Sequence, residues 1–227
     1  MVGNVIDLFN KNKILARAMD SAYVTKYDSE YRLDFTSWAS EFEFSKIGLY
    51  SLSTTLIMPE LDIPVYKSIG FLINSDKADI RHVCKSDSLS SGNELNGDFN
   101  ALGNNLKTID NLVNYIKENN SHLMNEVNIN IKNDAYVGLF YRKCPSLRVL
   151  SNVLLAQTLL ERLSGIKYPI FEYDGKNLNY KDFSDDFKMD FLSKMCEDKT
   201  LFSQYIYYYV IDEVCFNYLN YKKIEEI

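Results

Sequence analysis

Histidine, glycine and proline are all scarce in this 227-residue chain, which contains 2, 9 and 4 of them, respectively. Few glycines and prolines argue against long flexible linkers, so we expect a single domain over residues 1–227. The two histidines and four cysteines form no cluster with a zinc-ligand spacing, and we expect no metal. Widely spaced cysteines without a CxxC pair are typical of reduced thiols, which predicts a cytoplasmic protein.

The sequence also lacks the short motifs that mark several enzyme classes. It contains no HExxH, no phosphate-binding P-loop, no GxGxxG and no GxSxG. Zinc proteases, P-loop nucleotide hydrolases, Rossmann dehydrogenases and α/β-hydrolases therefore lose their usual sequence support. We expect no cofactor from these patterns.

Charge and hydropathy exclude two further classes. The net charge of −6 and the pI near 5.1 argue against nucleic-acid binding, which depends on neutralising phosphates with Lys and Arg. No run of about 18 uncharged apolar residues occurs, so no segment is expected to span a membrane. Asp7, Lys11 and Arg17 interrupt the first twenty residues, so we expect no signal peptide.

Hydrophobic periodicity predicts an α+β fold. Residues 5–24 have apolar side chains at three- and four-residue spacings, which indicates one or two short helices. From Tyr31 the period changes to two, and residues 31–85 are typical of an antiparallel β-meander. Within it, a Ser-Asp-Lys cluster predicts a hairpin between the segments ending at Asn74 and Cys84.

The rest of the chain adds helices and a hairpin. Residues 106–124 and 147–164 have helical apolar stripes, the second ending at Gly165. An Asp174-Gly175 pair predicts a tight hairpin turn. Residues 183–227 are expected to form a helical region that caps the domain.

The stretch "IRHVCKSDS" places His82 two residues before Cys84, so both side chains lie on one face of a strand. A Cys–His nucleophile pair is one interpretation, but its members ordinarily come from different structural elements. We interpret the stretch instead as a strand that ends in a polar loop. That loop, residues 86–105, is rich in Ser, Asn, Asp and Gly, and Asn93 and Asp98 are its candidate binding residues.

One constellation resembles the Arg-Ser-Glu ADP-ribosyltransferases, which use NAD. An aromatic-Arg pair ends at Arg32, and a Ser-Thr-Thr string starts at Ser53. Glu126 is the best-placed glutamate, although Met124 occupies the position where that family has a second acidic or amide residue. The resemblance implies that the arginine holds the dinucleotide phosphates, and that the glutamate stabilises the positive sugar transition state. Arg32, Ser53 and Glu126 are the catalytic candidates of this alternative.

The chain has 17 tyrosines, and several of them crowd into its last predicted helix. One helix face cannot bury all of them with every hydroxyl group satisfied, so we expect some to be exposed; they are Tyr205, Tyr208, Tyr209, Tyr218 and Tyr221. Tyrosine is enriched at protein interfaces. The leading hypothesis is therefore a protein that binds a partner protein or a second copy of itself, for example as a pathogen effector or a viral or mobile-element protein. An effector would act in the host cytosol.

Overall fold

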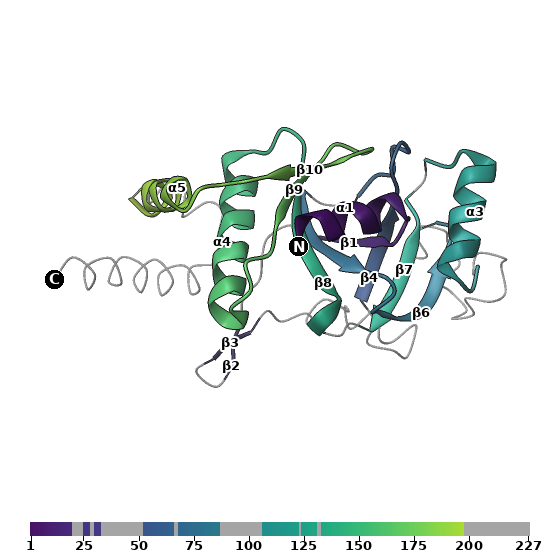
Figure 1. Cartoon of the computed structure of the whole chain (residues 1–227), viewed down its shortest axis with the longest axis horizontal. Helices are drawn as coiled ribbons and strands as arrows, with labels where there is room; N and C mark the ends of the chain where they lie inside the picture. The colour runs from purple at the N-terminus through teal and green to yellow at the C-terminus, as the bar shows by residue number, and fades with distance from the viewer. Residues whose placement is uncertain are drawn as a thin grey trace, which may run out of the picture.

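The computed structural model describes residues 1–19, 25–27, 30–32, 52–65, 68–86, 106–122, 124–130 and 133–197. These residues form a large, mostly antiparallel sheet with helices packed on it, so the α+β class is confirmed at this level (Figure 1). The helices are α1 (Val2–Asn10), α3 (Ile109–Asn119), α4 (Leu147–Ser164) and α5 (Asp185–Glu197). The strands of the large sheet are β1 (Ile14–Met19), β4 (Leu52–Ile57), β5 (Ile69–Asn74), β6 (Asp79–Cys84), β7 (Glu126–Asn130), β8 (Tyr136–Arg142), β9 (Ile170–Tyr173) and β10 (Leu178–Lys181).

The order of the strands differs from the expected meander. The eight-stranded sheet runs β10-β9-β8-β5-β1-β4-β7-β6, and only β8 and β9 pair in parallel. β5 and β6, expected to be a hairpin, are separated by β1, β4 and β7. A second, two-stranded sheet pairs β2 (Thr25–Tyr27) with β3 (Glu30–Arg32).

The opening segment forms one helix and one strand, rather than helices alone. α1 ends at Asn10, and Asn12 adopts a positive φ of 58° that turns the chain into β1. β1 lies at the centre of the sheet, with Ile14 and Ala16 in one core cluster and Leu15 in the other. A strand buried on both faces has a continuous apolar run, which periodicity alone does not distinguish from a helix.

Two hydrophobic clusters occupy the two faces of the sheet. One contains Leu112 of α3 and Leu154 of α4, and the other contains Val5 and Phe9 of α1. Figure 1 shows α1 across the front of the sheet and α4 and α3 toward its two ends. The central strands β1, β4 and β5 contribute alternate residues to the two clusters, as a pleated sheet requires, whereas β6 and β7 contribute to one cluster only.

The sequence signals for the two ends of α4 and for the β9–β10 turn agree with the structure. The Ser146 hydroxyl accepts a hydrogen bond from the Val149 N–H at the start of α4, and Gly165 ends the helix with φ 68°. The Asp174-Gly175 turn joins β9 and β10 as an antiparallel hairpin, and Gly175 has φ 100°. Among the described residues, no helix is both long and apolar enough to cross a membrane.

Candidate functional site

The structure brings two of the three transferase candidates together. Ser53 on β4 pairs in register with Asn128 on the neighbouring β7. Glu126 lies two residues before Asn128, so its side chain shares the same face, and Asn128 Nδ2 donates to Glu126 Oε1 at 3.2 Å. Arg32 is the last residue of β3 in the separate two-stranded sheet, and its side chain lies outside the described part of the chain.

A buried asparagine fixes the register that places Glu126. Asn125 Nδ2 donates to the Leu56 carbonyl at 3.0 Å, and Asn125 Oδ1 accepts from the Leu56 N–H at 2.8 Å. The side chain thus imitates one more backbone pair of the β4–β7 ladder. Because Asn125 directly precedes Glu126, these two hydrogen bonds hold the start of β7 against β4.

Strand β6 extends the same face. His82 pairs with Asn128, and Cys84 pairs with Glu126. We call these five residues, Ser53, His82, Cys84, Glu126 and Asn128, the polar sheet face. Glu126, Asn128 and Cys84 are buried, whereas His82 and Ser53 are partly exposed. The sequence analysis missed Asn128, although the alternation of Glu126, Val127 and Asn128 already predicts a polar side to this strand.

Burial sets the protonation states on this face. Desolvation and, to a smaller extent, the Glu126 charge raise the pKa of Cys84 to about 12, so the thiol stays protonated at neutral pH. Desolvation also lowers the pKa of His82, against the opposing effect of Glu126. A buried, protonated thiol is a poor nucleophile. The strand interpretation of "IRHVC" is confirmed, and the structure gives the Cys–His pair no activated thiolate.

No group of three or more His, Cys, Asp or Glu side chains in the described ranges could hold a metal ion.

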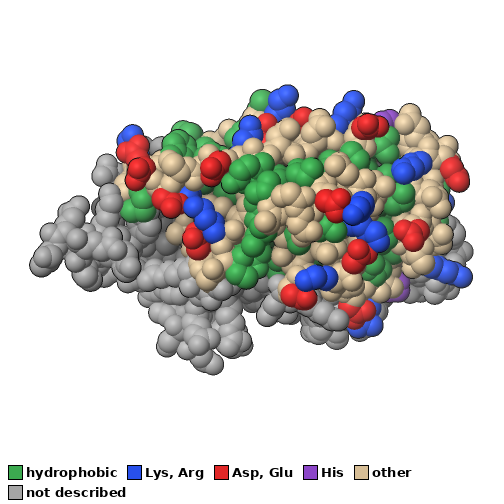
Figure 2. Space-filling view, viewed as in Figure 1, with side chains coloured by type: hydrophobic (Ala, Val, Ile, Leu, Met, Phe, Trp, Pro, Cys, Tyr) green, Lys and Arg blue, Asp and Glu red, His purple; other side chains and the backbone are tan. Residues whose placement is uncertain are grey.

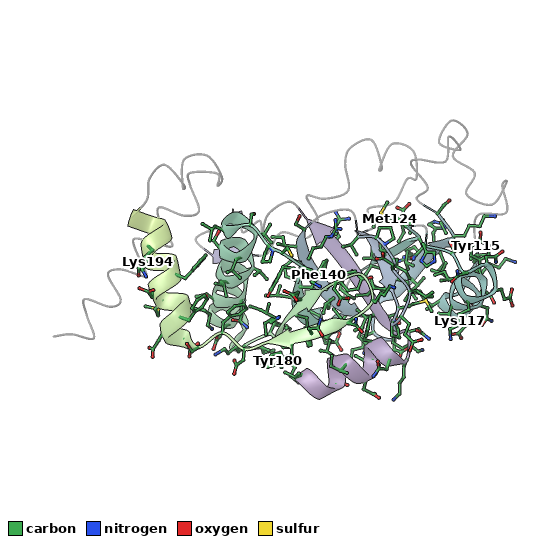
Figure 3. The ribbon with its side chains drawn as sticks, turned by 90° about the horizontal axis from the view of Figure 1, so that it is seen from above. Tyr115, Lys117, Met124, Phe140, Tyr180 and Lys194 are labelled. Atoms are coloured by element: carbon green, nitrogen blue, oxygen red, sulfur yellow. The ribbon has the colours of Figure 1, made fainter. Side chains whose placement is uncertain are left out.

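A second candidate site lies on β10 and α5, where aromatic rings remain exposed. Phe187 stacks between Phe183 and Phe191, with ring centroids 5.5 and 5.8 Å apart. Its side chain is nevertheless 43% exposed, and that of Tyr180 on β10 is 44% exposed. Figure 3 shows Tyr180 near the rim of the molecule and Phe140 inside it.

Ile166, which is also exposed, directly precedes Lys167 in the sequence. The adjoining Lys167 forms a 2.9 Å ion pair with Asp185 at the start of α5, and its charge acts on the Tyr180 hydroxyl. We call Ile166, Tyr180 and Phe187 the aromatic surface. In Figure 2, hydrophobic and charged side chains lie side by side at the end of the molecule that holds α5 in Figure 1.

A polar network fixes α5 beneath this surface. Lys188 is buried, and its Nζ lies 2.8 Å from Asp185 Oδ1 and 3.1 Å from Gln157 Oε1 on α4. Hydrogen bonds from Lys188 and Lys167 hold the pKa of Asp185 at about 2. Gln157 in turn donates to the Tyr168 carbonyl. α5 is therefore tied to α4 and to the segment before β9.

The remaining predicted contacts lie outside the described residues. These are Asn93 and Asp98 of the polar loop and Tyr205, Tyr208 and Tyr209 of the last predicted helix.

No protein-family model matches the chain, and no curated protein matches it.

Proposed function

We propose that this protein acts by binding a partner protein, and that the aromatic surface is a contact site. The observation that carries the proposal is Phe187, a large ring held rigidly in a stack and still 43% exposed. Exposed aromatic side chains on a rigid element supply large contact area at a small entropic cost.

The surroundings of the surface support the same conclusion. Tyr180 offers a ring with a polar tip, as is common in interfaces, and the Lys167–Asp185 ion pair supplies a charged rim. The Lys188 network holds α5 in place before any partner arrives, so little ordering is needed on binding. Tyr205, Tyr208 and Tyr209 follow α5 in sequence and are proposed to extend the contact, with Asn93 and Asp98 as further candidates.

The partner remains to be identified, so the first experiment is site-specific photo-cross-linking. A photoreactive phenylalanine replaces Phe187 or Tyr180 in the full chain, in the cells that produce the protein. The matched control replaces Leu147, which is the first residue of α4 and is 55% exposed. We expect one discrete adduct from positions 187 and 180, and none from 147. An adduct with a second copy would make the protein a homo-oligomer, whereas a different protein would fit an effector or a mobile-element product. Failure of both test positions to give an adduct contradicts the proposal.

The transferase alternative has one observation in its favour, the shared face of Ser53 and Glu126. It also needs Arg32, which the structure places in a different sheet. Calorimetric titration with NAD separates the two hypotheses. The partner-binding proposal predicts no binding, whereas micromolar binding that is lost in Arg32→Ala would favour the enzyme.

A further inference from the structure

An open cavity of about 410 Å³ lies where β8 and β9 end, apart from the residues of both candidate sites. Its polar lining comprises Asp62, His122, Arg142, Lys143, Tyr173 and Asp174. Arg142 and Lys143 come from the end of β8, Asp62 from the segment after β4, and His122 from the segment after α3. The volume is in the range of cavities that hold small molecules.

Hydrogen bonds between distant segments fix the walls of this cavity. The Tyr173 hydroxyl lies 2.8 Å from the carbonyl oxygens of both Ile63 and Gly175. The Lys143 N–H donates to the Tyr173 carbonyl at 2.9 Å. Gly175 has φ 100°, which favours glycine, and this turn lies directly against the Asp62 side chain. The cavity is therefore preformed.

Charged side chains around the cavity act on one another without direct contact, since the Lys143 charge lowers the pKa of Asp174. In the part of the chain that the structure describes, the side chains of Asp62, Arg142 and Lys143 form no ion pair or hydrogen bond. Lys11, by contrast, pairs with its neighbour Asp7 at 2.7 Å on α1. The cavity thus presents cationic donors and a carboxylate acceptor, all available to a ligand.

Asp174 has a different role in the same wall. Its Oδ1 accepts the N–H groups of Lys176 and Asn177, at 2.9 and 2.8 Å, which holds the β9–β10 turn. Asp174 also lines the cavity beside Asp62, although its Oδ2 accepts a hydrogen bond from the Asn177 side chain at 3.2 Å. The lining therefore offers both signs of charge, together with an apolar strip from Ile63 to Val65.

We propose that this cavity binds a small zwitterion with a carboxylate and an ammonium group, of which a free α-amino acid is the simplest case. The ligand carboxylate lies against Arg142 and Lys143, because a guanidinium can bind a carboxylate through two parallel hydrogen bonds. The ligand ammonium lies against Asp62 and Asp174, and its apolar part against the strip from Ile63 to Val65. A ligand with only one charge leaves one sign of the lining unpaired.

The test is thermal-shift screening of the full chain with the 20 common amino acids, followed by calorimetry on each that stabilises it. Each ligand that binds is compared with its N-acetyl derivative, which lacks the ammonium, and with its amide, which lacks the carboxylate. We expect both derivatives to bind at least about tenfold more weakly, since each loses a charge-assisted interaction. The proposal is overturned if no amino acid binds, or if either derivative binds as well as its parent.

Two variants locate the site. Arg142→Gln and Asp62→Asn each remove one charge from an exposed side chain and are expected to weaken the binding about tenfold. Arg81→Gln, at an exposed arginine of β6, is the matched control and should leave the affinity unchanged. Each variant is first melted without ligand, so that a folding defect is seen directly. Equal affinity in all three variants would place the ligand elsewhere and overturn the proposal.

Discussion

The polar sheet face and the aromatic surface reverse the usual relation between residue type and burial. On the polar sheet face, Glu126 and Asn128 are 5% and 2% exposed and hydrogen bonded to each other. On the aromatic surface, Phe187 and Tyr180 are more than two-fifths exposed. Burial, rather than side-chain chemistry, therefore decides which of the two can meet a partner. The buried acid and amide stabilise the sheet, whereas the exposed rings are available for binding.

Thiol reactivity should show the largest contrast between buried and exposed groups. Cys84 is fully buried with a pKa of about 12, whereas Cys144 is exposed. A chain that keeps only Cys84, with the other cysteines replaced by serine, should react with a thiol reagent at pH 8 only as fast as it unfolds. A matched chain that keeps only Cys144 should react completely in the same time. The absorbance change on labelling measures the reaction rate of each chain. Fast labelling of Cys84 in the folded chain would show that the polar sheet face is accessible to solvent.

Asn128→Ala should have the next largest effect, on stability. It removes the amide that donates to buried Glu126, which is expected to cost about 1–3 kcal/mol of unfolding free energy. The control is Asn179→Ala, an exposed asparagine on edge strand β10, which should change stability by less than about 0.5 kcal/mol. Urea denaturation measures both. Equal losses would mean that the polar sheet face contributes no more than the surface does.

Sequence alone predicts the local features of this fold well. Gly165 ends α4, and Asp174-Gly175 turns the β9–β10 hairpin, because both signals depend on the conformations that a few neighbouring residues can adopt. The same reasoning correctly places a helix at α5 and a strand at β6.

Non-local pairing accounts for most of what the sequence analysis missed. The cluster after Asn74 resembles a hairpin turn, but β5 pairs with β1 and β8, which lie far away in sequence. The pairing of Ser53 with Asn128 likewise depends on β4 and β7 being neighbouring strands, although they lie far apart in sequence. The sequence also does not predict that the Phe187 side chain is exposed. Its helical spacing is typical of a buried stripe, which would consist of Phe183, Phe187 and Phe191.

Phe187→Ala should have a smaller effect on stability than Asn128→Ala and a large effect on binding. The ring is partly solvated, so its loss is expected to cost only about 1 kcal/mol of unfolding free energy. The most direct test of the account is therefore the dissociation constant of the Phe187→Ala variant for the protein identified by cross-linking, measured by calorimetry beside Leu147→Ala. The account predicts at least about thirtyfold weaker binding for Phe187→Ala and less than about threefold for Leu147→Ala. Equal affinities for the two variants would contradict it.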